Sequence, residues 1–282
     1  MIERLRARQL IQTVALFALV FGVLCLQACR SPMPDSRSAQ LDVLTAPEPD
    51  AQRQRAMRRL ALASAYFEQN QSDAALQEAR AALQIDATYP QAFSLIGLIH
   101  QRANAPVLAQ QSFEQALQLA SQPPATPADL AEVQHNYGWF LCQQDRFEPA
   151  QAQLTQAVSQ PGYRQVGKSW MALGLCQLRA GQKTQAHRSF DAALALEPGN
   201  PLARYQLAVL DWQNGDAQRA QATLTSLNSS PQASAESLWL GVQLARALAQ
   251  PQEQRRLAQQ LNQSFPNSTQ ALALAQGKFQ DQ

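Results

Sequence analysis

The sequence has little charge and few aromatic side chains. Of its 282 residues, 16% are charged and 7% are aromatic. Lysine and arginine number 23 against 21 acidic residues, and the excess lies within the first 28 residues, so 20 of each sign remain in the rest of the chain. A neutral chain without a basic run gives no reason to expect a nucleic-acid partner.

The motifs of common enzymes are also missing. The chain has three histidines, and it contains no His-Glu-x-x-His, no Gly-x-Ser-x-Gly and no glycine-rich phosphate loop. We therefore expect no enzyme activity, no metal site, no nucleotide site and no small-molecule substrate. One alternative is a Cys/His nucleophile from His135 and Cys142, but seven residues of helix separate them by about 10 Å, too far for a base to hydrogen-bond a thiol.

The first 29 residues have the pattern of an export signal. Residues 1–8 carry three arginines, residues 9–29 carry no charge, and residues 11–26 are almost wholly apolar. A positive end, an apolar middle and a small residue before the cut are typical of a secretory signal peptide, here residues 1–28. The alternative is an uncleaved membrane helix, but about 16 apolar residues fall short of the roughly 17–25 that span a bilayer.

The signal ends in Leu-Gln-Ala-Cys at residues 26–29, which resembles the bacterial lipobox. The resemblance implies that Cys29 becomes the mature N-terminus and carries a covalent lipid, with palmitate among its acyl chains. Two or more acyl chains hold a protein stably on a membrane. Arg30 stands where aspartate favours inner-membrane retention in enterobacterial lipoproteins, so the expected location is the outer membrane, facing the periplasm.

Residues 29–52 contain several prolines and show no hydrophobic periodicity. We expect a disordered tether there, between the lipid anchor and the folded part. The remainder, residues 53–282, is rich in alanine, glutamine and leucine, which favours helix.

A repeat of about 34 residues organises this remainder. Residues 170–174 read Trp-Met-Ala-Leu-Gly, and Ala186, Phe190, Ala193 and Pro198 follow. This spacing resembles the tetratricopeptide repeat (TPR), a hairpin of two helices, A and B. The same frame places a small residue at position 8 of six repeats: Ala63, Gly97, Gly138, Gly174, Ala208 and Gly241.

The fold class predicted from this frame is an all-α TPR superhelix, or α-solenoid. The expected repeats span residues 56–89, 90–123, 131–164, 167–200, 201–233 and 234–267, and a terminal helix spans residues 268–279. Small residues at positions 8 and 20 let the two helix axes of a hairpin approach closely, and larger residues fill the space around them. A single hairpin cannot bury its apolar face alone, so stacking provides the stability.

A more specific resemblance lies in the third repeat and near the end. Residues 136–142 read Asn-Tyr-Gly-Trp-Phe-Leu-Cys, residues 238–241 read Leu-Trp-Leu-Gly, and residues 265–268 read Phe-Pro-Asn-Ser. With the lipobox and six repeats, the chain resembles the type IV pilus biogenesis/stability lipoproteins, the PilF/PilW family of pilotins. The resemblance implies a protein that binds the pilus secretin and promotes its localisation or multimerisation in the outer membrane. The alternative is a general periplasmic TPR adaptor lipoprotein in envelope biogenesis.

In a TPR array the concave face is lined mainly by positions 2, 5, 9, 12 and 13 of the A helices. In this chain those positions are more apolar and aromatic than charged, which favours a groove for a hydrophobic segment of a partner protein. The predicted partner-binding residues are Phe67, Leu98, His135, Trp139, Met171, Leu175, Tyr205, Trp212 and Leu238. The other interpretation is that several of these rings pack against neighbouring helices.

Two cysteines remain once Cys25 leaves with the signal and Cys29 takes the lipid. Cys142 and Cys176 lie one repeat apart, on adjacent A helices, and an oxidising periplasm would permit a disulfide between them. They occupy positions 12 and 10 of the frame, so spacing alone leaves a second possibility, two buried thiols.

Overall fold

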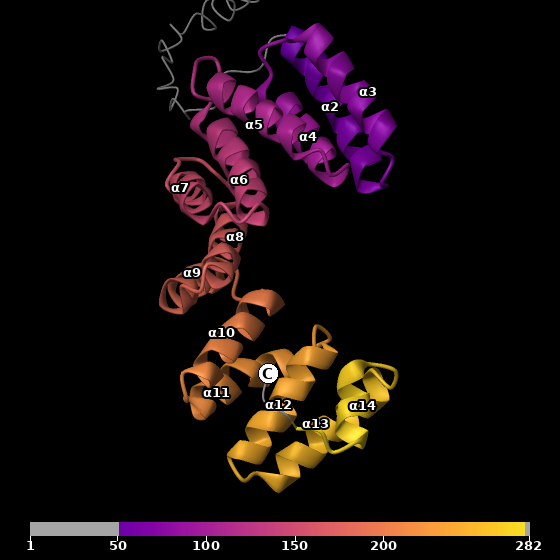
Figure 1. Cartoon of the computed structure of the whole chain (residues 1–282), viewed down its shortest axis with the longest axis vertical. Coiled ribbons are helices and arrows are strands. Elements are labelled where there is room, and N and C mark those ends of the chain that lie inside the picture. The colour runs from indigo at the N-terminus through magenta and orange to yellow at the C-terminus, as the bar shows by residue number, and fades with distance from the viewer. Residues whose placement is uncertain (1–50, 280–282) are drawn as a thin grey trace, which may run out of the picture. The chain divides into compact units, whose positions relative to one another are not determined.

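The computed structural model describes residues 51–279, which form thirteen helices and, within that range, no strand. Figure 1 shows the helices in chain order. The expected signal peptide, the lipid site at Cys29 and nearly all of the expected tether lie outside the described residues. No helix within the described range is both long enough and apolar enough to cross a membrane.

Twelve of the helices pair as six hairpins, each with an A helix and a B helix. The hairpins are α2 (Ala51–Glu68) with α3 (Ser72–Ile85), α4 (Pro90–Arg102) with α5 (Pro106–Ala120), α6 (Pro127–Gln143) with α7 (Phe147–Val158), α8 (Val166–Arg179) with α9 (Lys183–Leu196), α10 (Pro201–Gln213) with α11 (Ala217–Asn228), and α12 (Ala235–Ala247) with α13 (Pro251–Ser264). A last helix, α14 (Thr269–Ala275), follows. This arrangement confirms the all-α TPR superhelix.

Every hairpin makes its turn with the same backbone motif. The second residue after the end of each A helix has a positive φ. These residues are Asn70, Asn104, Asp145, Gly181, Gly215 and Ala249. The next amide N–H donates to a carbonyl five residues earlier, as from Gln182 to Gln177 over 2.8 Å, which is the 6→1 bond of a Schellman motif. Glycine, asparagine and aspartate adopt this left-handed conformation readily, whereas Ala249 adopts it at a cost in backbone strain.

Small residues at position 8 bring the two helices of a hairpin together. A Cβ atom added at Gly174 would lie 2.6 Å from Cε1 of Phe190, and one at Gly97 would lie 2.8 Å from a ring carbon of Phe113. Both phenylalanine rings are fully buried. The rings therefore occupy the space that glycine leaves, which is the physical reason for the small residue in the repeat.

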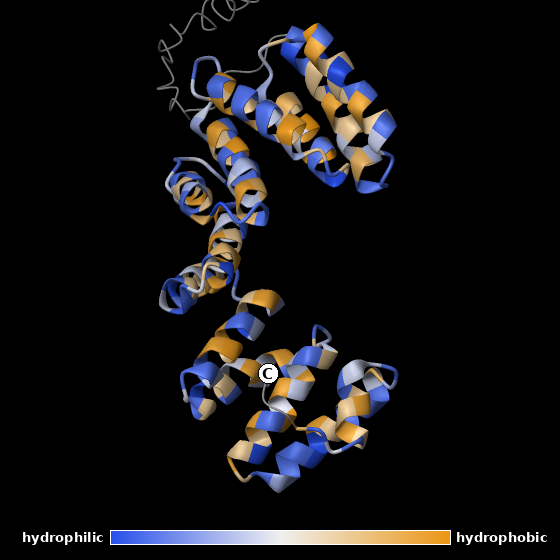
Figure 2. Cartoon of the chain, in the orientation of Figure 1, coloured by the Kyte–Doolittle hydropathy of each residue, from blue (hydrophilic) through white to orange (hydrophobic). Residues whose placement is uncertain are grey.

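Each hairpin packs on the next through its own B helix and the following A helix. Apolar clusters follow one another along the array, so that Phe113 of α5, for example, shares a cluster with Leu141 and Cys142 of α6. Figure 2 shows apolar and polar residues alternating along the helices. The stability of the fold comes from this series of interfaces between neighbouring hairpins.

Three boundaries differ from those expected. The first helix begins at Ala51, whereas the frame began the first repeat at residue 56 and the tether was expected to reach residue 52. The third hairpin begins at Pro127, a proline suited to the first helical position, whereas the frame placed this repeat at residue 131. The terminal helix ends at Ala275 and not at Phe279. Gly277 has a φ of 64°, and the amide N–H of Lys278 donates to the carbonyl of Ala273 over 3.0 Å, so another Schellman motif ends the helix early.

Candidate partner-binding site

Successive A helices contact one another from α2 to α8, and again between α10 and α12. Asn136 Nδ2 of α6 donates to Ser94 Oγ of α4 over 3.0 Å, and Arg179 of α8 forms an ion pair of 2.7 Å with Asp145 after α6. These contacts use positions 5, 6 and 13 of the repeat. Positions 5, 9, 12 and 13 are spaced so that they share one face of a helix, so the A helices together present a continuous surface.

Six of the nine predicted partner-binding residues are half-buried on this surface. They are Phe67, Leu98, Trp139, Leu175, Tyr205 and Trp212. Each packs with one side against a core cluster and leaves the other side accessible. These side chains therefore pack in the core, as the second interpretation expects, and also contribute to the accessible surface, while their binding of a partner stays a prediction.

The prediction is wrong for His135, Met171 and Leu238, which are buried. Met171 shares a cluster with Leu207 of α10, and Leu238 is 0% exposed in a cluster that contains Leu261 of α13. In both cases the elements that follow cover the side chain. A partner cannot reach these residues without opening the array.

His135 is a structural residue. Its Nδ1 lies 2.8 Å from Ser169 Oγ, which in turn lies 3.0 Å from the Tyr163 hydroxyl. Burial, and secondarily the charge of Lys168, lowers the pKa of His135 to about 4, so the ring is neutral at neutral pH. Ser169 is fully buried and cannot act as a nucleophile on an external substrate.

Position 9 supplies the most regular part of the surface. Leu98, Trp139, Leu175 and Val209 occupy this position in α4, α6, α8 and α10, and all four are half-buried. We call these four residues, with the flanking Phe67, Tyr205 and Trp212, the apolar stripe. Val209 was not predicted, although the repeat frame that found the other three would have found it. The series stops in α12, where Val242 is 0% exposed.

Arginine and aromatic side chains meet at both ends of the array. The Arg102 guanidinium lies 3.5 Å from the centre of the Phe67 ring. Near the C-terminus, the Trp239 and Phe279 rings stack at 5.5 Å, and Arg246 lies 4.4 Å from the Phe279 ring. Phe279 thus covers part of α12 with the chain's own side chain, a contact that the sequence did not predict.

Cys142 and Cys176 form a disulfide, with their Cα atoms 5.7 Å apart. The bond joins α6 to α8, the A helices of the third and fourth hairpins, and both residues are fully buried. The bonded Cys142 has no thiol to serve as a nucleophile. The Cys/His hydrolase alternative is therefore wrong.

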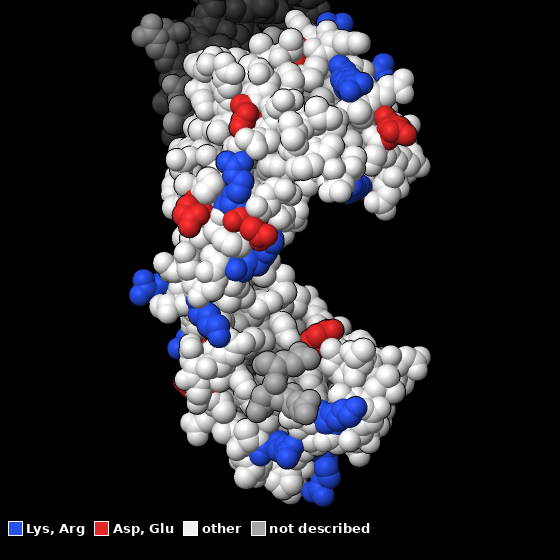
Figure 3. Space-filling model, in the orientation of Figure 1, with Lys and Arg blue, Asp and Glu red and all other residues white. Residues whose placement is uncertain are grey.

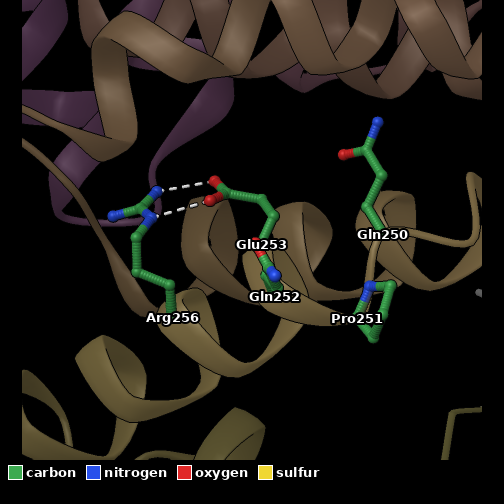
Figure 4. Close-up of a pocket in the computed structure, with 5 residues that line it drawn as sticks. All are labelled: Gln250, Pro251, Gln252, Glu253 and Arg256. Atoms are coloured by element: carbon green, nitrogen blue, oxygen red, sulfur yellow. Dashed lines mark hydrogen bonds and ion pairs between the residues drawn. The ribbon is translucent and has the colours of Figure 1, made fainter.

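Two hollows lie away from the stripe. Gln250, Pro251, Gln252, Glu253 and Arg256 line the first (Figure 4), where Arg256 donates two hydrogen bonds to Glu253 and thereby lowers its pKa. The second includes His187, whose two ring nitrogens lie 3.0 Å from carboxylate oxygens of Asp191 and Asp211. Within residues 51–279 no group of three or more His, Cys, Asp or Glu side chains could hold a metal ion.

Stacked helical hairpins with an apolar stripe along the A helices define a TPR protein-interaction scaffold. Comparisons with known proteins agree: models of the tetratricopeptide repeat match residues 59–89 and 177–239.

The chain is homologous to the type IV pilus assembly protein PilF of Pseudomonas aeruginosa, with 26% identity over 72% of this chain and 78% of PilF. A solved structure of P. aeruginosa PilF superposes with a TM-score of 0.68 at 25% identity, covering 80% of this chain and 99% of that one. The crystal structure of PilW, a widely conserved type IV pilus biogenesis factor, gives 0.66 at 27% identity, covering 79% and 99%. The chain is thus homologous to PilF and structurally similar to PilF and PilW, which confirms the resemblance seen in its sequence.

Proposed function

We propose that this protein is a lipid-anchored scaffold of the type IV pilus machinery that binds the pilus secretin and promotes its localisation or multimerisation in the outer membrane. The observation that carries the proposal is the apolar stripe, on a chain homologous to PilF over most of its length. The similarity to PilW, a pilus biogenesis factor, supports the same role.

The stripe suits an extended or helical segment of a partner. Leu98, Trp139, Leu175 and Val209 repeat once per hairpin, so a single partner segment can contact several hairpins. Large aromatic residues such as Trp139 and Trp212 bury much area with few rotatable bonds, which makes them effective anchors. The charged residues of the chain contribute less to this surface than its apolar ones do.

The mechanism we propose is tethering. A lipid at Cys29 would confine the scaffold and its bound secretin subunit to the membrane surface. Confinement raises the effective concentration of one subunit for another and so favours ring assembly without any new contact between them. No covalent step and no cofactor besides the lipid is needed.

The test of the stripe is a pair of double variants. Trp139→Ala/Trp212→Ala should abolish co-purification of the secretin from cross-linked membranes and reduce secretin multimers, while the thermal unfolding curve stays cooperative. The matched control is Val107→Ala/Leu108→Ala, which removes apolar side chains that are 68% and 48% exposed on the B helix α5. Unchanged secretin recovery with the folded tryptophan variant would refute the proposed binding surface.

The anchor is tested separately. We expect palmitate labelling of the wild-type chain and none of Cys29→Ser, with the unlabelled variant lost from the outer-membrane fraction. A strain that lacks the protein yet keeps surface pili and secretin multimers would instead favour a general periplasmic adaptor.

A further inference from the structure

The first helix of the array is strongly basic. Residues 51–59 read Ala-Gln-Arg-Gln-Arg-Ala-Met-Arg-Arg, and the first acidic residue of α2 is Glu68. Cations near the N-terminus of a helix oppose the helix dipole, so this arrangement costs stability. Residues 29–282 hold 20 basic and 20 acidic residues, and outside α2 these numbers are 16 and 19, so the basic excess is a local feature of this one helix.

Two of the four arginines, Arg55 and Arg58, lie on a face that the following A helices use for packing, whereas Arg53 forms an ion pair of 2.5 Å with Asp86. Positions 3, 7 and 10 are Ala92, Ile96 and Ile99 in α4, and all three are buried against the preceding hairpin. The same positions in α2 are Arg58, Leu62 and Ala65, and all three are exposed. No hairpin precedes α2 within the described residues, so this end face of the array has no packing partner there.

Arg55 lies one turn before Arg58 on the same face and is also exposed. Within residues 51–279 neither side chain forms a hydrogen bond or an ion pair, whereas Arg59 at the edge of the face forms an ion pair of 2.9 Å with Glu78. Leu62, which is 40% exposed, lies one turn after Arg58 on the same face, and the exposed Ala65 follows it. Figure 3 shows basic side chains on the surface over α2 and α3.

The need for a polar outer face on the first hairpin does not explain why this face carries arginines. A terminal repeat requires a polar outer face, but glutamine or acidic residues supply one, and the helix N-terminus favours acids. Exposed arginines close to a bilayer are attracted to anionic lipid headgroups, and an exposed leucine beside them can bury apolar area at the interface.

We propose that the exposed face of α2 formed by Arg55, Arg58 and Leu62 binds the anionic headgroups of a lipid bilayer. The inference rests on the proposed function at one point, the lipid at Cys29. A flexible chain of 22 residues, the number from Cys29 to Asp50, has a root-mean-square span of about 25 Å, so a lipid at Cys29 would keep α2 close to the membrane. Contact through α2 would then fix the first hairpin at the bilayer.

The experiment uses an unlipidated chain of residues 30–282, which keeps every described core cluster. Sedimentation with vesicles of phosphatidylcholine mixed with phosphatidylglycerol should show binding, and vesicles of phosphatidylcholine alone should show none. An arginine near an anionic surface strengthens partitioning onto the vesicles about fivefold. Removing two of them in Arg55→Gln/Arg58→Gln should therefore reduce partitioning about 25-fold. Binding should also fall as salt shortens the Debye length.

Two further variants separate this site from general charge. Arg55→Lys/Arg58→Lys should retain most of the binding, and Arg164→Gln/Arg188→Gln, which removes the same charge from exposed positions elsewhere, should leave it unchanged. Equal loss in the Arg164/Arg188 control, equal binding to both vesicle types or no binding to either overturns the proposal. Because this chain carries no lipid, a failure here differs from a failure of Cys29 to label with palmitate.

Discussion

Acid should destabilise this protein through His135. The residue is 6% exposed, its Nδ1 contacts Ser169, and burial followed by the charge of Lys168 lowers its pKa to about 4 from an ordinary value of 6.5. As the pH falls below about 6.5, the unfolded chain takes up a proton at this site before the folded chain does, so protonation favours unfolding. The loss begins near pH 6.5 and ends near pH 4, where both states are protonated.

These two pKa values set the magnitude. With these values, acidification from about pH 7 to about pH 5 should lower the free energy of unfolding by about 2 kcal/mol. The assay is urea unfolding followed by tryptophan fluorescence at both pH values. His135→Gln keeps a hydrogen-bonding side chain near Ser169 but does not titrate, so its stability should fall less with acid than that of the wild type, by about 2 kcal/mol.

His100 provides the control. Its pKa is also lowered, first by burial and then by the charge of Arg80, so it contributes to acid sensitivity with the same sign. His100→Gln should therefore leave the larger part of the pH dependence in place. If wild type and His135→Gln lost equal stability on acidification, the assignment of the effect to His135 would be wrong.

Three other changes should alter stability. Reduction of the disulfide, which spans 34 residues, should lower the free energy of unfolding by about 4 kcal/mol, measured in urea with and without reductant. Gly174→Ala should cost about 1–3 kcal/mol because the new Cβ would meet the Phe190 ring, whereas Gly199→Ala, with nothing within 4 Å, should not; equal effects would contradict the packing argument. Ala249→Gly should stabilise by about 1 kcal/mol by relieving a positive φ of 54°, and a lower thermal midpoint would contradict this.

The hairpins could be predicted because their cause is local. In five of the six hairpins a glycine or alanine at position 8 faces a phenylalanine or leucine at position 24, so their spacing is visible in the sequence. The turn after α12 was harder to anticipate, because Ala249 does not favour the left-handed conformation that the Schellman motif requires there. The repeated hairpin geometry requires the left-handed conformation at Ala249, although alanine disfavours it.

The binding surface was only partly predictable. The frame identifies the face of each A helix, and for Leu98, Trp139 and Leu175 that face is accessible. It does not say how closely the next hairpin packs, and this distance decides that Met171 and Leu238 are covered. The contact of Phe279 with Trp239 was likewise unpredictable, because Phe279 lies outside the repeats and the frame says nothing about where it packs.

The sequence by itself therefore determined the class of fold, its repeat length and the chemical character of the A helices, because each follows from spacings of a few residues along one helix or within one hairpin. The tertiary structure alone decided which of those side chains remain accessible and that Cys142 meets Cys176, positions that differ by two in the frame. It also decided that Arg55 and Arg58 lie on a face of α2 against which no hairpin packs within residues 51–279. Each of these depends on how one hairpin sits against its neighbour, which local spacing does not fix.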